Sequence, residues 1–578
     1  MEKLNISRLS KLLLVAAIAI LIISALANFR DYQDSWVLEG IEVPFALFVI
    51  VYVTAFFLEK KTSWMIVLAI IARIVFLIIP NLKYSWLQGT ALDQQLQYAL
   101  SNNVLRTGHI STESAYGAAA YTSTPLTHLS FSVFSIVLNI PVVDAMKYLP
   151  VLWSPLVPLL TFVIVDKMEF ARKTPVVKCA LFFSSIPFTT EQYLVTGSLL
   201  GSVLALLILS SLVLILRKND RRYWLVCTIF VIALAAAHAV TTVILSASML
   251  AILMLQGVPY FQLKSRFRAT AILAIVSINV AWIMYQASYA LNVIAHLVFF
   301  GVPSGVTPES ERIPSTFFEE LRVSPLSAIK SFSVLYGADA FLLILTLVSL
   351  IILLKTQKGP NDILRFTCLL GWLFLSLIVV GALVGVGGPR VLFFAELLFP
   401  IFGGILVSWI SGSLRARKWI RSAITTLIIL SVILLATIEL YSCQPLVPPA
   451  NIVYPGLPSN VPIGYVGQVN SIYQRQAVFF AENHVKGLIA SDSTTSDQII
   501  GLTGLNWSAE HLVEYYPIDK SQPGQMYDYF LIHLPGKSGI LSELAPVRVP
   551  SQMLDTIYNS SIVYTNGESY MLSASPLR

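Results

Sequence analysis

The sequence is poor in charge and in cysteine. Asp, Glu, Lys and Arg make up only 12% of the 578 residues, whereas 56% are hydrophobic and the mean hydropathy is +0.75. This composition excludes an ordinary soluble globular protein, which carries about twice that share of charged residues. The four cysteines form no CxxC pair, which excludes a disulfide framework and a thiol-rich metal site. We therefore interpret the chain as an integral membrane protein.

The sequence is instead rich in long apolar runs. A helix needs roughly 17 to 25 apolar residues to cross about 30 Å of hydrocarbon, because it rises about 1.5 Å per residue. About thirteen runs meet this requirement, and we predict an all-α polytopic membrane bundle. The predicted crossings are 12–29, 42–58, 63–80, 147–165, 179–196, 197–216, 223–238, 241–256, 269–290, 338–354, 364–386, 391–410 and 422–441.

Basic residues concentrate in the short loops between these runs. The loops hold most of the 38 Lys and Arg residues but few of the 31 acids. Lys and Arg are retained on the cytoplasmic side of a membrane, so we predict that these loops and the N-terminus are cytoplasmic. The charge pattern gives no indication of a nucleic-acid partner. The loops are 1–11, 59–61, 166–178, 217–222, 257–268, 355–365 and 411–421.

Two segments leave the number of crossings open. The apolar run 126–140 is only about 15 residues long, and we interpret it as a helix along the outer interface rather than a crossing. A crossing there would place Lys167 and Lys178 outside and break the charge pattern. The first apolar run ends in Ala25-Leu26-Ala27, which resembles a signal-peptidase site, but its core is long for a cleaved signal. We expect a retained anchor.

The chain divides into four regions. An N-terminal transmembrane helix pair (1–62) precedes a transmembrane module (63–441), and a Pro-rich linker (442–463) leads to a polar tail (464–578). We predict that the tail folds as a small extracytoplasmic α/β domain. The module carries outer loops at 81–146 and 291–337. The elements expected in the tail are helices at 471–485 and 493–502, a strand at 527–534 and a hairpin around Asn566-Gly567.

Polar groups that hydrocarbon penalises are the candidates for function. Asp93 follows the apolar run 64–80 and opens a polar outer loop that also carries Arg106 and several Gln and Asn residues. A carboxylate near the membrane surface can accept a proton from a hydroxyl or help to bind a divalent cation. The alternative is a solvated loop aspartate without a role.

Asp93 also belongs to a larger pattern. A Gly-containing polar stretch follows it, then Tyr121-Thr122-Ser123-Thr124-Pro125-Leu126 leads into the interfacial helix, and Tyr148-Leu149-Pro150 begins the next span. This arrangement resembles the first outer loop of GT-C membrane glycosyltransferases, and the resemblance covers roughly 63–410. It is similar to protein O-mannosyltransferases, lipid A aminoarabinose transferases and the oligosaccharyltransferase catalytic subunit, especially archaeal ones. The resemblance implies a GT-C-like fold and a catalytic Asp93, as base or cation ligand.

Two further outer positions match parts of this superfamily. Glu191, in Thr190-Glu191-Gln192-Tyr193, stands where the oligosaccharyltransferase branch carries a second acidic motif that holds a divalent metal. Only one acid is present here, and the alternative is an outer charge without a role. His238 lies at a predicted outer turn, where archaeal relatives place similar histidines. With Glu191 it is a possible metal ligand, or it touches the substrate; the alternative is a hydrogen-bonded structural residue.

Two arginines are candidates for binding the donor phosphate. Arg390 follows glycines at the outer mouth of a predicted span, and a guanidinium binds phosphate oxygens in a forked geometry. Several superfamily members place an Arg there for the lipid phosphate; the alternative is a snorkelling interfacial arginine. Arg73 and Glu396 lie inside apolar runs, where an unpaired charge is costly. They are expected to form an ion pair, or Arg73 reaches the phosphate.

The predicted function follows from the resemblance and these residues. We expect an inverting transfer of a sugar, a monosaccharide, from a polyprenyl- or dolichyl-phosphate donor to a hydroxyl of a glycan, lipid or protein acceptor on the outer face, as in mannosyltransferases. The tail has no Trp-Trp-Asp motif, which argues against oligosaccharide transfer to Asn. A divalent cation, Mg or Mn, is the only cofactor suggested. The alternatives are a lipid-linked glycan transporter or flippase and a non-catalytic membrane scaffold. Loop candidates are Arg106, Glu309, Glu311 and Arg312.

Overall fold

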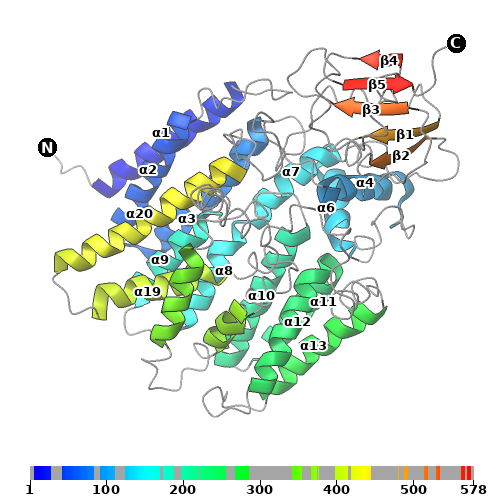
Figure 1. The fold of residues 1–578 in the computed structure, drawn as a ribbon. Helices are drawn as coiled ribbons and strands as arrows, with labels where there is room; N and C mark the ends of the chain where they lie inside the picture. The colour runs from blue at the N-terminus through cyan, green and yellow to red at the C-terminus, as the bar shows by residue number, and fades with distance from the viewer. Residues whose placement is uncertain are drawn as a thin grey trace, which may run out of the picture.

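The chain forms a large helical bundle with a small β-sheet at one end (Figure 1). This structure is a computed structural model that describes only some of the residues. These are 6–27, 42–83, 92–110, 124–168, 173–187, 197–218, 220–255, 267–285, 341–353, 366–373, 375–376, 397–413, 418–443, 480, 487–491, 513–517, 529–533, 561–565 and 569–573.

Most of the described helices follow the predicted apolar runs. The predicted crossing 179–196 is wrong in its bounds, because the helix there begins at Lys173, ends at Ser185 and is followed by non-helical residues 186 and 187. Four of the described helices are long and apolar enough to cross a membrane, namely Leu9–Ala27, Thr62–Ile79, Val142–Lys167 and Leu199–Lys218, and the other apolar helices are shorter. The length and apolar composition of these helices support the interpretation of the chain as a membrane protein. The labelled helices are α1 (Ile6–Ala27), α2 (Glu42–Leu58), α3 (Thr62–Lys83), α4 (Leu92–Thr107), α6 (Leu126–Leu138), α7 (Val142–Trp153), α8 (Leu156–Lys167), α9 (Lys173–Ser185), α10 (Gly197–Lys218), α11 (Arg221–Ala237), α12 (Ala239–Leu255), α13 (Phe267–Tyr285), α19 (Phe399–Ser413) and α20 (Lys418–Cys443).

Glycines allow α19 and α9 to pack closely, and this is the most extensive helix pair of the described part. A Cβ added at Gly404 would lie 2.8 Å from the carbonyl oxygen of Val176 and 3.0 Å from the backbone nitrogen of Ala180. Backbone atoms cannot move aside as a side chain can, so only glycine fits. Small residues that bring two helices together are typical of packing in membranes, where no hydrophobic effect drives helices together.

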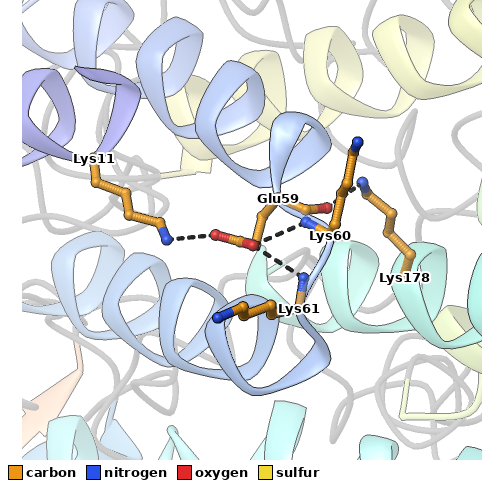
Figure 2. A network of polar contacts seen from close by, with 5 residues as sticks. All are labelled: Lys11, Glu59, Lys60, Lys61 and Lys178. Atoms are coloured by element: carbon orange, nitrogen blue, oxygen red, sulfur yellow. Dashed lines mark hydrogen bonds and ion pairs between the residues drawn. The ribbon is translucent and has the colours of Figure 1, made fainter. Parts of the chain in front are cut away.

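A polar network joins the first helices to α9 (Figure 2). The Nζ of Lys11 on α1 lies 2.5 Å from Glu59, which follows α2, and 4.1 Å from the ring centroid of Trp64. Glu59 also accepts hydrogen bonds from the backbone N–H groups of Lys60 and Lys61, at 2.9 and 3.0 Å. From the other side, Lys178 on α9 donates to the carbonyl oxygens of Phe57 and Glu59 at 2.7 and 2.9 Å.

This network brings together three of the segments predicted to be cytoplasmic, 1–11, 59–61 and 166–178. Their meeting at one end of the bundle agrees with the prediction that they share one side of the membrane. Which side they face stays a prediction. Since α3 runs away from this end, its other end and α4 lie at the opposite end of the bundle.

Three helices, α4, α6 and α7, form a separate small unit at that opposite end (Figure 1). Phe131 of α6 packs in a core cluster of its own with Val142, Met146 and Leu149 of α7. With 13 residues, α6 spans only about 20 Å, less than the hydrocarbon thickness. It ends at Asn139, whose positive φ of 52° turns the chain toward α7. The helix is too short to cross the hydrocarbon, in agreement with that part of the prediction, and its position at the outer interface stays a prediction.

One expectation for this unit is corrected. The polar stretch from Asp93 was interpreted as a loop, but residues 92–107 form the helix α4. The reason is visible in the spacing of Leu92, Leu96 and Leu100, which lie four residues apart and therefore on one side of a helix. The polarity of the other positions hid this pattern.

The tail contains a five-stranded sheet with the order β2-β1-β3-β5-β4. Its strands are β1 (Gly487–Ser491), β2 (Val513–Pro517), β3 (Tyr529–His533), β4 (Ser561–Thr565) and β5 (Ser569–Ser573). β1 pairs in parallel with β2 and β3, whereas β5 pairs antiparallel with β3 and β4. The predicted strand at 527–534 is observed as β3 and the predicted hairpin as β4–β5; β1 and β2 were not predicted. The predicted tail helices lie outside the described residues, apart from residue 480.

Replacing Gly404 with Ala should destabilise the bundle by about 1–3 kcal/mol, because the new Cβ meets backbone atoms that must shift. Gly403→Ala is the matched control, since its Cβ would meet the ring of Phe183, a side chain that can adjust, at 2.9 Å. Thermal unfolding in detergent measures both variants. A loss from Gly403→Ala equal to or larger than that from Gly404→Ala would contradict the backbone contact.

Glu59 should make stability depend on pH. Burial alone would raise the pKa of its carboxyl, but the Lys11 ammonium and the backbone N–H groups of Lys61 and Lys60 lower it from 4.5 to about 2. A carboxyl with a lowered pKa stabilises the folded state above its unfolded pKa and loses this contribution as the pH falls. We expect wild type to melt higher than Glu59→Gln at pH 7, with the difference shrinking from about pH 4.5 downward. A difference independent of pH would refute this.

Candidate functional site

Asp93, the predicted catalytic acid, is the second residue of α4. Gln97 and Ser101 follow it by one and two turns and are 1% and 0% exposed, so α4 is packed into the protein directly after Asp93. The Ser101 hydroxyl lies within hydrogen-bond distance of two carbonyl oxygens, that of Gln97 at 2.6 Å and that of His128 on α6 at 3.3 Å. Ser132 of α6 returns a bond to the carbonyl oxygen of Ser101 at 3.0 Å. These bonds fix the helix that carries Asp93 against α6.

His128 was not singled out from the sequence, yet it is the most unusual group in this unit. Its side chain is fully buried, and neither ring nitrogen has a hydrogen-bond partner among the described residues. The Oε1 atom of Gln97 is also buried and has no hydrogen-bond partner in the part of the chain that the structure describes. Buried polar atoms are nearly always bonded, and each exception costs about 1–3 kcal/mol. Unsatisfied groups of this kind are typical of functional sites.

A corner between α11 and α12 holds His238 beside this unit. The Nδ1 atom of His238 lies 2.6 Å from the Thr241 hydroxyl and accepts the Thr241 backbone N–H at 3.2 Å. The corner packs tightly against α10 at Gly201. A Cβ added at Gly201 would lie 2.7 Å from the Thr241 hydroxyl oxygen. Thr127 of α6 donates to the carbonyl oxygen of Ala237 at 3.1 Å. His238 therefore lies next to the first turn of α6, and its Nδ1 atom takes part in hydrogen bonds within the corner.

Arg73 lies in the interior of α3 and is 2% exposed. Its Nε donates to the hydroxyl of Ser154, after α7, at 2.7 Å, and its Nη1 donates to the carbonyl oxygens of Ser184 and Ile186 at 3.1 and 3.3 Å. The expected partner Glu396 lies outside the described residues. The described contacts of Arg73 are therefore with neutral oxygens at the end of α9 and after α7.

A second buried cation, Lys147 of α7, was missed by the sequence analysis. It is only 3% exposed, and its Nζ lies 5.8 Å from the ring centroid of Tyr148. Ser154, the partner of Arg73, follows it by two turns on the same face of α7. Its position as the first residue of the predicted span 147–165 was the available signal, because a lysine inside an apolar segment is costly unless it has a use.

Of the remaining candidates, the structure describes only Arg106. Arg106 lies in the last turn of α4 and is exposed. Glu191, Arg390, Glu309, Glu311 and Arg312 lie outside the described residues. Within the described part of the chain, no group of three or more His, Cys, Asp or Glu residues could hold a metal ion. A divalent cation therefore stays a prediction that depends on Glu191.

Similarity to known proteins is confined to three-dimensional structure. No protein-family model matches the sequence. No curated protein matches it in sequence either. The fold, however, is similar to that of the Archaeoglobus fulgidus oligosaccharyltransferase in complex with Zn and sulfate. That protein is 12% identical with a TM-score of 0.52, and the similarity covers 89% of this chain and 74% of that chain.

Two further structures are similar over the same share of this chain, 89%. The archaeal oligosaccharyltransferase AglB from Archaeoglobus fulgidus, in complex with an inhibitory peptide and a dolichol-phosphate, is 11% identical with a TM-score of 0.50 over 75% of its length. ArnT from Cupriavidus metallidurans, bound to undecaprenyl phosphate, is 9% identical with a TM-score of 0.50 over 99% of its length. The chain therefore shares the fold of these proteins, which confirms the resemblance at the level of the fold.

Replacing His128 with Phe should leave thermal stability unchanged or raise it, because the ring gives up no hydrogen bond and a buried unsatisfied group is removed. Thr127→Val is the control, since its hydroxyl bonds the carbonyl oxygen of Ala237, and it should cost about 0.6–1.5 kcal/mol. Melting curves of the two purified variants test this. A marked loss of stability in His128→Phe would show that the ring is satisfied in the resting protein.

Proposed function

We propose that the protein is a membrane glycosyltransferase that moves a sugar from a polyprenyl- or dolichyl-phosphate donor to a hydroxyl acceptor. The observation that carries the proposal is the GT-C-like fold with Asp93 on a helix at the end of the bundle opposite Glu59, packed with the helix that carries the buried Lys147. Two proteins of similar fold were solved with dolichol-phosphate and with undecaprenyl phosphate, which supports a lipid-linked donor here.

A lipid-linked donor suits a site at the end of an apolar bundle. An isoprenoid tail is retained by hydrocarbon, at about 0.8 kcal/mol for each buried CH₂ group, while the phosphate and sugar reach the polar end. We propose Arg390 and Lys147 as the cations that bind the donor phosphate. Both side chains carry a positive charge that can bind the negatively charged oxygens of a phosphodiester.

In the proposed reaction, Asp93 accepts the proton of the acceptor hydroxyl while the hydroxyl oxygen bonds to the anomeric carbon of the sugar. The bond between that carbon and the phosphate oxygen breaks, and the electron pair leaves with the polyprenyl phosphate. The leaving phosphate gains one negative charge, which Lys147 and Arg390 stabilise. A single displacement of this kind inverts the anomeric carbon.

Asp93 and Glu191 are the residues that would hold a divalent cation, Mg or Mn, which would supply further positive charge at the phosphate. A protein of similar fold was solved with zinc. The absence of a Trp-Trp-Asp motif in the tail favours a hydroxyl acceptor and a monosaccharide donor. We place this reaction on the outer face, with the N-terminus cytoplasmic, and keep the division into 1–62, 63–441, 442–463 and 464–578.

Replacing Asp93 with Asn should lower transfer of a radiolabelled sugar from polyprenyl phosphate by about 10²-fold or more, because the amide cannot accept the proton. Membrane vesicles with equal amounts of each variant serve for the assay. Asp166→Asn is the control. Asp166 pairs with Lys167 at the end of α8 that points away from α7, so this substitution should leave transfer unchanged.

Undiminished transfer by Asp93→Asn would remove the mechanism. If labelled sugar lipid crosses the membrane in wild-type vesicles without any transfer, the protein is a transporter instead. If neither transfer nor translocation occurs with dolichyl- and undecaprenyl-phosphate sugars, a scaffold that displays its tail is the better explanation.

A further inference from the structure

The helix α9 ends inside the bundle rather than at its surface. It has 13 residues and is about 20 Å long, short of the roughly 30 Å of hydrocarbon. Lys178, in its first half, binds the Phe57 and Glu59 carbonyl oxygens at one end of the bundle. The last residue, Ser185, lies only about 10 Å further along the helix axis. Ser184, Ser185 and Ile186 are buried, so the carbonyl oxygens at this end of the helix need hydrogen-bond donors from within the protein.

Arg73 supplies the missing donors. Its Nη1 reaches the carbonyl oxygens of Ser184 and Ile186, which lie at the last turn of α9, while its Nε bonds Ser154. A positive charge beside the carboxyl end of a helix is also favoured by the helix dipole. The guanidinium therefore caps α9 and ties it to α3 and α7 at the same time.

The other side of the same turn is held by Tyr52 of α2. The Tyr52 hydroxyl lies 2.5 Å from the Ser185 hydroxyl oxygen, and Ser185 itself donates to the carbonyl oxygen of Phe182 at 2.6 Å. Both Tyr52 and Ser185 are buried. The end of α9 is thus held by side chains from two other helices, Tyr52 of α2 and Arg73 of α3, and of these two Arg73 is the one that bonds carbonyl oxygens; Ser154 holds Arg73 in turn.

Each element that Arg73 joins leads along the chain to a residue of the proposed site. The chain runs from α3 into α4 and Asp93, Lys147 shares a face of α7 with Ser154, and Glu191 follows α9 in the sequence. We infer that Arg73 is a positioning residue, which sets the end of α9 relative to α3 and α7 and acts through them rather than by binding the donor phosphate. Its effect on turnover rests on the function proposed above; its capping of α9 does not.

Lysine cannot replace Arg73 in this role. The planar guanidinium donates from Nε and Nη in two fixed directions, whereas an ammonium is a single point charge on a flexible stem. Arg73→Lys keeps the charge and should therefore lose the geometry alone. Ser154→Ala removes one of the described bonds of Arg73 and should give a smaller effect of the same kind.

The test compares Arg73→Lys with Lys178→Met, which removes a second cation of the bundle; Lys178 lies on α9 itself and binds the carbonyl oxygens of Phe57 and Glu59 at the end of α2. Hydrogen–deuterium exchange in 181–187 should be at least tenfold faster in Arg73→Lys and unchanged in Lys178→Met. Per folded protein, kcat for sugar transfer should fall about tenfold in Arg73→Lys, with KM for the donor within about twofold, and stay unchanged in Lys178→Met. Binding of undecaprenyl phosphate should be as in wild type.

Two results would overturn the inference. Wild-type exchange in 181–187 of Arg73→Lys would show that the end of α9 does not depend on the guanidinium. Binding of undecaprenyl phosphate weakened more than fivefold, with exchange unchanged, would make Arg73 a phosphate ligand. If wild type transfers no sugar at all, the proposed function fails, and the exchange measurement still decides whether Arg73 positions α9.

Discussion

Hydrocarbon offers no hydrogen-bond partners, and this constraint governs every polar group inside the bundle. It weighs most on helix ends, where carbonyl oxygens have no partner in the helix itself. Two cations meet the requirement at two depths. Lys178 binds the carbonyl oxygens of Phe57 and Glu59 near the end of α2, and Arg73 binds those of Ser184 and Ile186 at the end of α9. A short helix such as α9 is stable within the bundle because another helix carries its cap.

The unit that carries Asp93 obeys the same constraint almost throughout. Hydroxyl groups of Ser101, Thr127 and Ser132 each bond a carbonyl oxygen of a neighbouring helix, so α4, α6 and the corner after α11 are joined through backbone atoms. His128 and the Oε1 atom of Gln97 are the departures within this unit. Substrate sites often combine rigid, well-bonded helices with a few buried polar groups that have no partner. The stability of the surrounding helices offsets the free-energy cost of leaving those groups unbonded until a ligand binds.

Buried or partly buried charged groups lie at two levels of the bundle. Around Glu59, the Lys11 ammonium meets the carboxylate, and backbone N–H groups complete the shell of that carboxylate. Toward the other end, Lys147 and Arg73 are buried cations set on neighbouring helices. In the proposed reaction Lys147 binds the donor phosphate, and Arg73 keeps the end of α9 in position relative to α3 and α7. The distinction follows from their surroundings, because the described bonds of Arg73 go to protein oxygens.

The sequence by itself determined the class of protein and most of its helices, since the length and polarity of apolar runs are local properties. It also determined the strand β3 and the hairpin β4–β5, and the order of motifs around Asp93 was enough to indicate a GT-C-like fold. It misplaced Asp93 in a loop because polar residues masked the leucines spaced four apart in α4. Tertiary structure alone decided the partners of Arg73, which lie 81, 111 and 113 residues away in the chain. It likewise decided that His128 and Lys147 are buried, because burial depends on which helices pack together, and no single segment encodes that.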